Sequence, residues 1–117
     1  METDKITSIT ELNNIRKKLI KSSFNDLPAI IDLLDKAKKI AQTAPLRSMI
    51  RYDGTPFTNL EERQFFLTVL DRDINELPLI KAEFFNPYRS QMTITIVQLM
   101  ISISDFGIPE LAKIINE

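Results

Sequence analysis

The chain of 117 residues contains no cysteine, histidine or tryptophan, and only two glycines. Without cysteine it forms no disulfide and offers no thiolate nucleophile or thiolate metal ligand. Without histidine it has no Ser-His-Asp or Cys-His pair and no imidazole ligand. Two glycines are too few for a glycine-rich loop that holds phosphate. These absences favour a protein that is not an enzyme, with no catalytic residue, metal site or cofactor.

Long hydrophobic runs are also missing. The longest stretch without a charged residue spans residues 90–104, which is shorter than the roughly 20 apolar residues that cross a bilayer. The first residues mix both signs of charge and precede no secretory signal. We therefore expect a cytoplasmic protein without a membrane span. The 17 isoleucines suit an AT-rich genome, which favours a phage or bacterial origin.

Charge is balanced over the whole chain but not along it. Residues 1–51 hold ten Lys and Arg against six Asp and Glu, whereas residues 52–117 hold five against ten. The halves therefore carry net charges of +4 and −5. Two interpretations stay open: the halves complement each other within one domain, or a basic and an acidic face serve head-to-tail contacts or a charged partner.

Apolar spacing and helix-start signals predict an all-α single domain over residues 1–117, as a compact array of five to six helices. Capping boxes place helix starts at Ser8 and at Thr58. Pro28 suits the first turn of a helix that begins at Asn25 or Asp26. Residues 44–58 form the one irregular region, a loop or a small hairpin around Asp53-Gly54.

The central helix is predicted over about residues 87–105, with Asn86-Pro87 as its start and Gly107 as its cap. Its β-branched residues alternate like a strand at 93–97, but a helix alone explains the polar positions, which fall on one stripe. The stripe is either the exposed edge of the helix or a buried seam that would need a hydrogen-bonding ligand or subunit. Its members are Gln91, Thr95, Gln98, Ser102 and Asp105.

Two short helices flank this central one in the prediction. The first follows Pro78 and directs Ile80 and Phe84 inward. The second opens at Pro109 and continues through Ile115. The acidic side chains Asp71, Asp73 and Glu76 lack the spacing of a calcium loop, so we interpret them as a solvated helix face.

Large aromatic side chains give the main functional hypothesis. Adjacent Phe pairs on a helix point about 100° apart, so one small core does not easily bury both rings. An exposed aromatic patch marks a protein–protein site. We therefore expect a non-enzymatic interaction module, such as an adaptor, assembly component, inhibitor or immunity-type protein, that binds a protein partner or forms a homo-oligomer. The predicted partner-binding residues are Arg51, Tyr52, Phe57, Phe65 and Phe85.

The basic N-terminal half supports an alternative, a nucleic-acid-associated regulator. Its cations would form one anion-binding surface if the first two helices pack antiparallel, although a pI near 5.5 is low for such a domain. A second alternative is a small-ligand protein or enzyme with a pocket on the polar stripe. The residues of the basic surface are Arg16, Lys17, Lys18, Lys21, Lys38 and Lys39, with Lys36 beside them.

Overall fold

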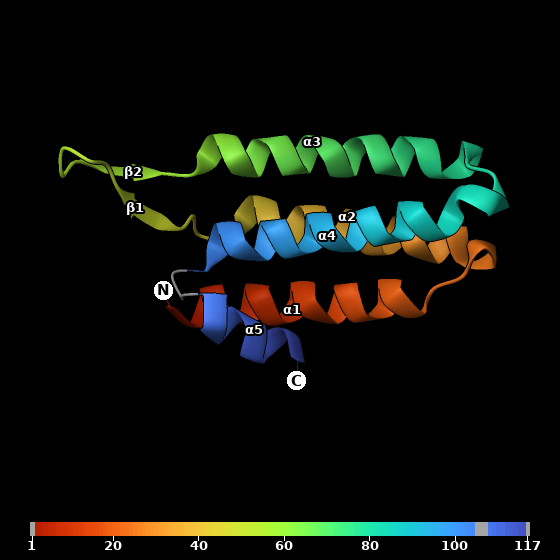
Figure 1. Cartoon of the computed structure of the whole chain (residues 1–117), viewed down its shortest axis with the longest axis horizontal. Helices are drawn as coiled ribbons and strands as arrows, with labels where there is room; N and C mark the ends of the chain where they lie inside the picture. Colours follow the sequence, from red (N-terminus) through yellow and green to blue (C-terminus); the bar gives the residue numbers. More distant parts are fainter. Residues whose placement is uncertain (1, 105–107, 117) are drawn as a thin grey trace.

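The computed structural model describes residues 2–104 and 108–116. Four long helices run along a molecule of 49 × 28 × 21 Å, and a two-stranded hairpin projects from one end (Figure 1). This arrangement confirms the predicted all-α class. The long helices are α1 (Glu2–Lys21), α2 (Leu27–Thr43), α3 (Leu60–Glu76) and α4 (Phe85–Ile103), and a short α5 (Ile108–Asn116) follows.

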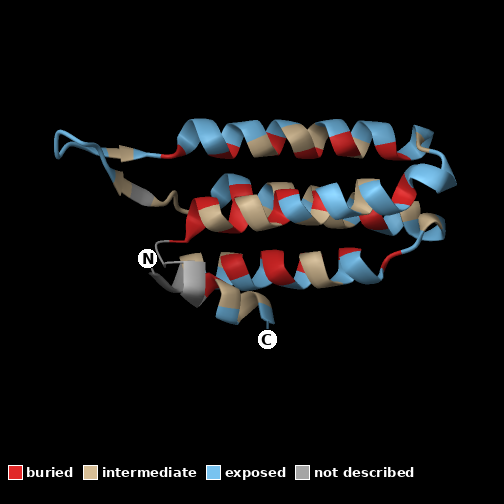
Figure 2. Ribbon diagram, viewed as in Figure 1, coloured by how far each residue is buried: buried red, intermediate tan, exposed pale blue. Residues whose placement is uncertain are grey.

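The core forms where α4 packs against α1, α2 and α3. Buried positions turn toward the middle of the bundle, while the tip of the hairpin is exposed (Figure 2). Burial of this apolar surface is the main favourable contribution to folding. The fully buried large side chains are Ile9, Leu12, Leu19, Ile30, Leu34, Leu70, Leu77, Met92, Ile96, Leu99, Met100 and Ile103.

The central helix α4 begins two residues before its predicted start and ends two residues before its predicted end. Phe84 is its N-cap, and Pro87 lies at the third helical position rather than the first. A proline is tolerated there because the first four backbone N–H groups of a helix have no partner inside it. Ser104 is the C-cap, and the predicted cap Gly107 lies outside the described residues.

Both predicted capping boxes are wrong. Helix α1 begins at Glu2, so Ser8 lies inside it; polar residues cost only about 0.5 kcal/mol each at internal positions, and the helix continues through them. Helix α3 begins at Leu60 with Asn59 as N-cap, and no side-chain cap is present. The Asn59 amide instead donates to the carbonyl of Ser102 at 3.1 Å, so a contact across the bundle replaces the local cap.

The connection between α3 and α4 differs from the predicted two-turn helix. It consists of two separate 3-10 turns, Leu77–Leu79 and Ala82–Phe84. Ile80 is half-buried as expected, but Phe84 is 58% exposed, so its predicted inward orientation is wrong. The extended backbone at Ile80 separates the two turns.

The irregular region is a hairpin of β1 (Ser48–Ile50) and β2 (Pro56–Thr58), paired antiparallel with Met49 opposite Phe57. Pro56 has no backbone N–H, and a two-stranded ribbon tolerates it because each strand has a free edge. In the described part of the chain, no helix combines the length and apolar character needed to cross a membrane.

Candidate functional site

Buried polar side chains fix the base of the hairpin. Arg63 is 3% exposed, and its guanidinium donates to the carbonyls of Ala44 and Pro45, just after α2. Burial lowers the pKa of the Arg63 guanidinium from its ordinary value. On the other side of the base, the Arg47 backbone N–H donates to the Ser102 carbonyl at 2.9 Å. The segment that leads from α2 into the hairpin is thus held by α3 and by the end of α4.

The tip of the hairpin is closed by its own hydrogen bonds. The backbone N–H of Gly54 donates to the Arg51 carbonyl at 2.8 Å, and Gly54 adopts φ +89°, a conformation that favours glycine. The Asp53 carboxylate accepts from the Thr55 backbone N–H at 3.0 Å and from its hydroxyl at 2.7 Å. These Thr55 hydrogen bonds lower the pKa of Asp53 below 3.8. The tip is therefore ordered without a partner.

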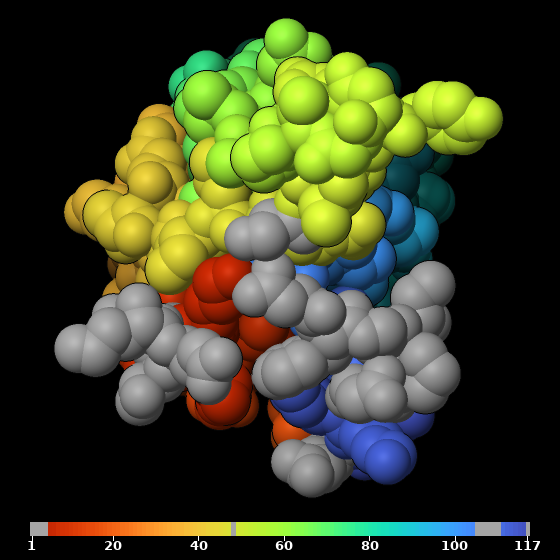
Figure 3. All heavy atoms as spheres, turned by 90° about the vertical axis from the view of Figure 1, so that its left-hand side faces the viewer, coloured from red at the N-terminus to blue at the C-terminus, as the bar shows by residue number. Residues whose placement is uncertain are grey.

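This fixed hairpin exposes large apolar side chains. Tyr52 is fully exposed, and Ile50 is 75% exposed. The Arg51 guanidinium carbon lies 4.7 Å from the ring centroid of Phe57, a cation–π contact. Figure 3, with the hairpin end facing the viewer, shows the hairpin atoms standing in front of the bundle. We call Met49, Ile50, Arg51, Tyr52, Phe57 and Leu60 the hairpin surface.

Two shallow hollows flank the Arg51–Phe57 pair. One, of about 520 Å³, lies toward the tip beside Ile50 and Tyr52. The other, of about 510 Å³, lies toward the first turn of α3, where Leu60 is 49% exposed. Arg51 and Phe57 line both hollows. A concave surface beside a protruding aromatic side chain can receive side chains of a partner protein.

The structure divides the predicted partner-binding residues. It brings Arg51, Tyr52 and Phe57 together on the hairpin. Phe65 lies on α3 and is 62% exposed, packed edge-to-face on Phe66 with ring centroids 5.1 Å apart. Phe85 contradicts the prediction, because it is 3% exposed. Its ring packs edge-to-face on Phe24, with centroids 5.9 Å apart, which makes Phe85 a core residue.

Sequence reasoning missed Ile50 and Leu60. The alternation of a strand places Ile50 on the same side of the chain as Tyr52, and this signal was available. Leu60 had no comparable signal, because an apolar residue in the first helical turn normally packs on the core. The buried guanidinium of Arg63 was also missed. Arginine is seldom buried, and the carbonyls that pair with Arg63 lie 18 and 19 residues away in the sequence.

The predicted basic surface is also divided. Arg16 donates to Asn13 and to the Ile115 carbonyl at the end of α5, both at 3.0 Å. Lys38 forms an ion pair with Asp71 on α3, and this hydrogen-bonded contact raises the pKa of Lys38. The packing of α1 with α2 leaves a groove whose walls include Lys18, Lys21, Lys36 and Lys39, but not Lys17.

The acidic residues Asp71, Asp73 and Glu76 of α3 do not form one solvated face, so that prediction is wrong. Asp71 pairs with Lys38, whereas Asp73 is 4% exposed. The Tyr88 hydroxyl lies 3.0 Å from both Asp73 Oδ1 and Glu76 Oε2. Burial raises the pKa of Asp73 from 3.8, and burial together with the two carboxylates raises the pKa of Tyr88. The cluster joins α3 to α4.

The polar stripe of α4 has two environments. Thr95 and Ser102 are buried, and their hydroxyls donate to the carbonyls of Gln91 and Leu99 within the helix. Gln91 is exposed and Gln98 half-buried, while Asp105 lies outside the described residues. The buried hydroxyls therefore require no ligand.

Comparison of the chain with protein-family models, curated protein sequences and solved structures found no significant match.

Proposed function

We propose that the protein is a non-enzymatic interaction module that binds a protein partner through the hairpin surface. The observation that carries the proposal is the full exposure of Tyr52 beside the 75% exposed Ile50, on a hairpin fixed at both its base and its tip. Aromatic and arginine side chains contribute most of the binding energy at protein interfaces. A surface ordered before binding also loses less conformational entropy on association.

The site suits a partner with a protruding apolar side chain (the knob) surrounded by polar residues. The hollows beside Arg51 and Phe57 would receive the knob, and Tyr52 would enter a pocket on the partner. The lack of cysteine supports a cytoplasmic adaptor, assembly component or inhibitor.

The alternative, nucleic-acid binding, is supported by the lysines of the α1/α2 groove. It is weakened by the engagement of Arg16 and Lys38 within the fold. Acidic side chains, Glu11, Asp26 and Asp32, also lie among the groove lysines. Binding driven by phosphate would fall steeply with salt, whereas contact through the hairpin surface would change little.

Photo-crosslinking tests the proposal. A photoreactive residue replaces Tyr52 in cells of the native host, and the same residue replaces Leu79, which is 83% exposed at the opposite end, as a control. We expect a discrete protein adduct from position 52 and none from position 79. The adduct partner is then purified, and Ile50→Ser with Tyr52→Ala should weaken its binding at least about tenfold. Identical adducts from both positions, or unchanged affinity, would contradict the proposal.

A further inference from the structure

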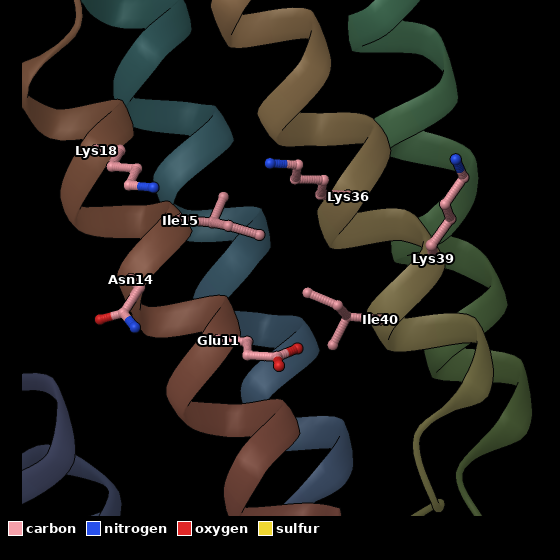
Figure 4. Close-up of a pocket in the computed structure, with 7 residues that line it drawn as sticks. All are labelled: Glu11, Asn14, Ile15, Lys18, Lys36, Lys39 and Ile40. Atoms are coloured by element: carbon pink, nitrogen blue, oxygen red, sulfur yellow. The ribbon is translucent and has the colours of Figure 1, made fainter.

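A groove between α1 and α2 combines an apolar floor with basic walls. Ile15 and Ile40 point into it from the two helices, and the ammonium groups of Lys18 and Lys36 point toward one another across it (Figure 4). Its volume is about 440 Å³, and a second hollow of about 420 Å³ continues it past Lys18 and Lys36 toward Lys21. Glu11 also lines the first hollow, and Asp26 and Asp32 line the second. The groove therefore suits an apolar side chain over Ile15 and Ile40, with its anions confined to the space between Lys18 and Lys36.

The four groove lysines differ in whether they have an anionic partner among the described residues. Lys39 pairs with Asp35 at 3.1 Å. In contrast, Lys18, Lys21 and Lys36 form no ion pair within 4.0 Å in the part of the chain that the structure describes. Two ammonium groups directed at one space repel each other, and an anion placed between them would remove that repulsion.

The exposed face of α3 carries the complementary chemistry. Phe65 is 62% exposed, and Glu61 and Glu62 precede it by four and three residues, which places all three on one helix face. Among the described residues, neither glutamate forms an ion pair within 4.0 Å. We call Glu61, Glu62 and Phe65 the α3 patch. It belongs to the acidic half of the chain, whereas the groove belongs to the basic half.

We propose that the α3 patch of one copy occupies the α1/α2 groove of a second copy, so that the protein associates head to tail. Phe65 would lie on Ile15 and Ile40, with Glu61 and Glu62 reaching Lys18 and Lys36. The spacing along the helices agrees: Glu61 precedes Phe65 by about 6 Å, and Lys18 follows Ile15 by about 4.5 Å. At the other end of the contact, the neutral Thr68 would face Glu11.

This contact goes beyond the proposed function, because it involves a second copy of the chain and the α1/α2 groove. Glu61 and Glu62 also line the hollow toward α3, so the two proposals are separated by Ile50 and Tyr52, which lie outside the α3 patch. The patch and the groove are different surfaces, so the contact is heterologous and yields rings or open chains of subunits. Variants of Ile50 and Tyr52 should therefore self-associate like the wild type, which separates failure of one proposal from failure of the other.

Sedimentation velocity tests the proposal with the full chain. The wild type should show a mass that rises with concentration and falls as salt screens the lysine–glutamate pairs. Lys18→Glu with Lys36→Glu should abolish association, and so should Glu61→Lys with Glu62→Lys. A mixture of the two double variants should associate again, because each groove then meets a patch of opposite charge.

The control exchanges charges that lie in neither surface, Lys81→Glu with Glu83→Lys, and should leave association unchanged. Phe65→Ser leaves every charge in place and should also weaken association. Circular dichroism confirms that each variant is folded. A wild type that stays monomeric, a folded double variant that associates like the wild type, or a mixture that fails to associate would overturn the proposal.

Discussion

The two ends of the bundle connect their helices in different ways. At one end, α1 reaches α2 through residues 22–26, and α3 reaches α4 through residues 77–84. At the other end, residues 44–59 link α2 to α3 and form the hairpin. Connections in helical bundles usually need about 2–8 residues. The segment that contains the hairpin is therefore longer than the connection between two helices requires. Its extra residues are available for function.

The ends also differ in how an arginine side chain binds the carbonyl groups that follow a helix. At the hairpin end, the buried Arg63 donates to two carbonyls after α2. At the opposite end, the half-exposed Arg89 donates to one carbonyl, that of Ser22 after α1, and lies over the Phe85 ring. Exposed apolar side chains and buried polar side chains occur at both ends: Arg63 at the hairpin end, and Asp73 at the opposite end. The difference is that Arg63 holds the chain that leads directly into the hairpin. A fixed support distinguishes a docking element from an ordinary turn.

The largest expected effect is a difference in stability between variants of Arg63 and of Arg89. Arg63→Met should lower the free energy of unfolding by about 3 kcal/mol, because it leaves one buried and one partly buried carbonyl without their donor. Arg89→Met should cost about 1 kcal/mol, because it removes one hydrogen bond from a half-exposed site where water can replace the donor. Urea denaturation measures both. Equal losses would show that the hairpin end is no more firmly anchored than the other.

The next effect concerns the buried carboxyl near the opposite end. Burial raises the pKa of Asp73 above 3.8, so the folded protein retains a proton that the unfolded chain releases. Stability should therefore fall as pH rises from about 3.8 through the folded-state pKa of Asp73.

Asp73→Asn removes this titration, so the stability of the wild type relative to the variant should decline over that pH range. Tyr88→Phe provides the matched control, because it removes a hydrogen bond that lowers the pKa of Asp73 and should extend the decline to higher pH. Thermal melts across the range measure both. Parallel profiles for wild type and Asp73→Asn would refute the assignment.

The sequence predictions were accurate where an element depends on residues close in the sequence, and wrong where it depends on contacts between distant residues. Apolar spacing and Pro28 are local signals, and they placed α2 correctly. Asp53-Gly54 likewise predicted the turn of the hairpin. The predicted starts of α1 and α3 were wrong: α1 continues through Ser8 from Glu2. In α3 the side chain of Asn59 bonds to Ser102 on another helix instead of capping its own helix. No local pattern reports that contact.

The candidate site was predictable in part for the same reason. The hairpin collects Arg51, Tyr52 and Phe57 through short-range pairing, which the sequence indicates. Whether a helical phenylalanine is core or surface depends on which helices lie beside it. Phe65 and Phe85 therefore look alike in sequence, yet one is 62% exposed and the other 3%.

The smallest expected effect on stability is at the hairpin surface itself. Ile50→Ser and Tyr52→Ala should each change the free energy of unfolding by less than about 0.5 kcal/mol, because these exposed side chains leave no cavity. Leu79→Ser, at the opposite end, should be equally neutral. Urea denaturation of the three variants decides this. If they are neutral alike while only the hairpin variants lose the partner, the apolar side chains of the hairpin contribute to binding and not to the fold. A hairpin variant that costs several kcal/mol would instead make its side chain part of the core, and the distinction between the two ends would fail.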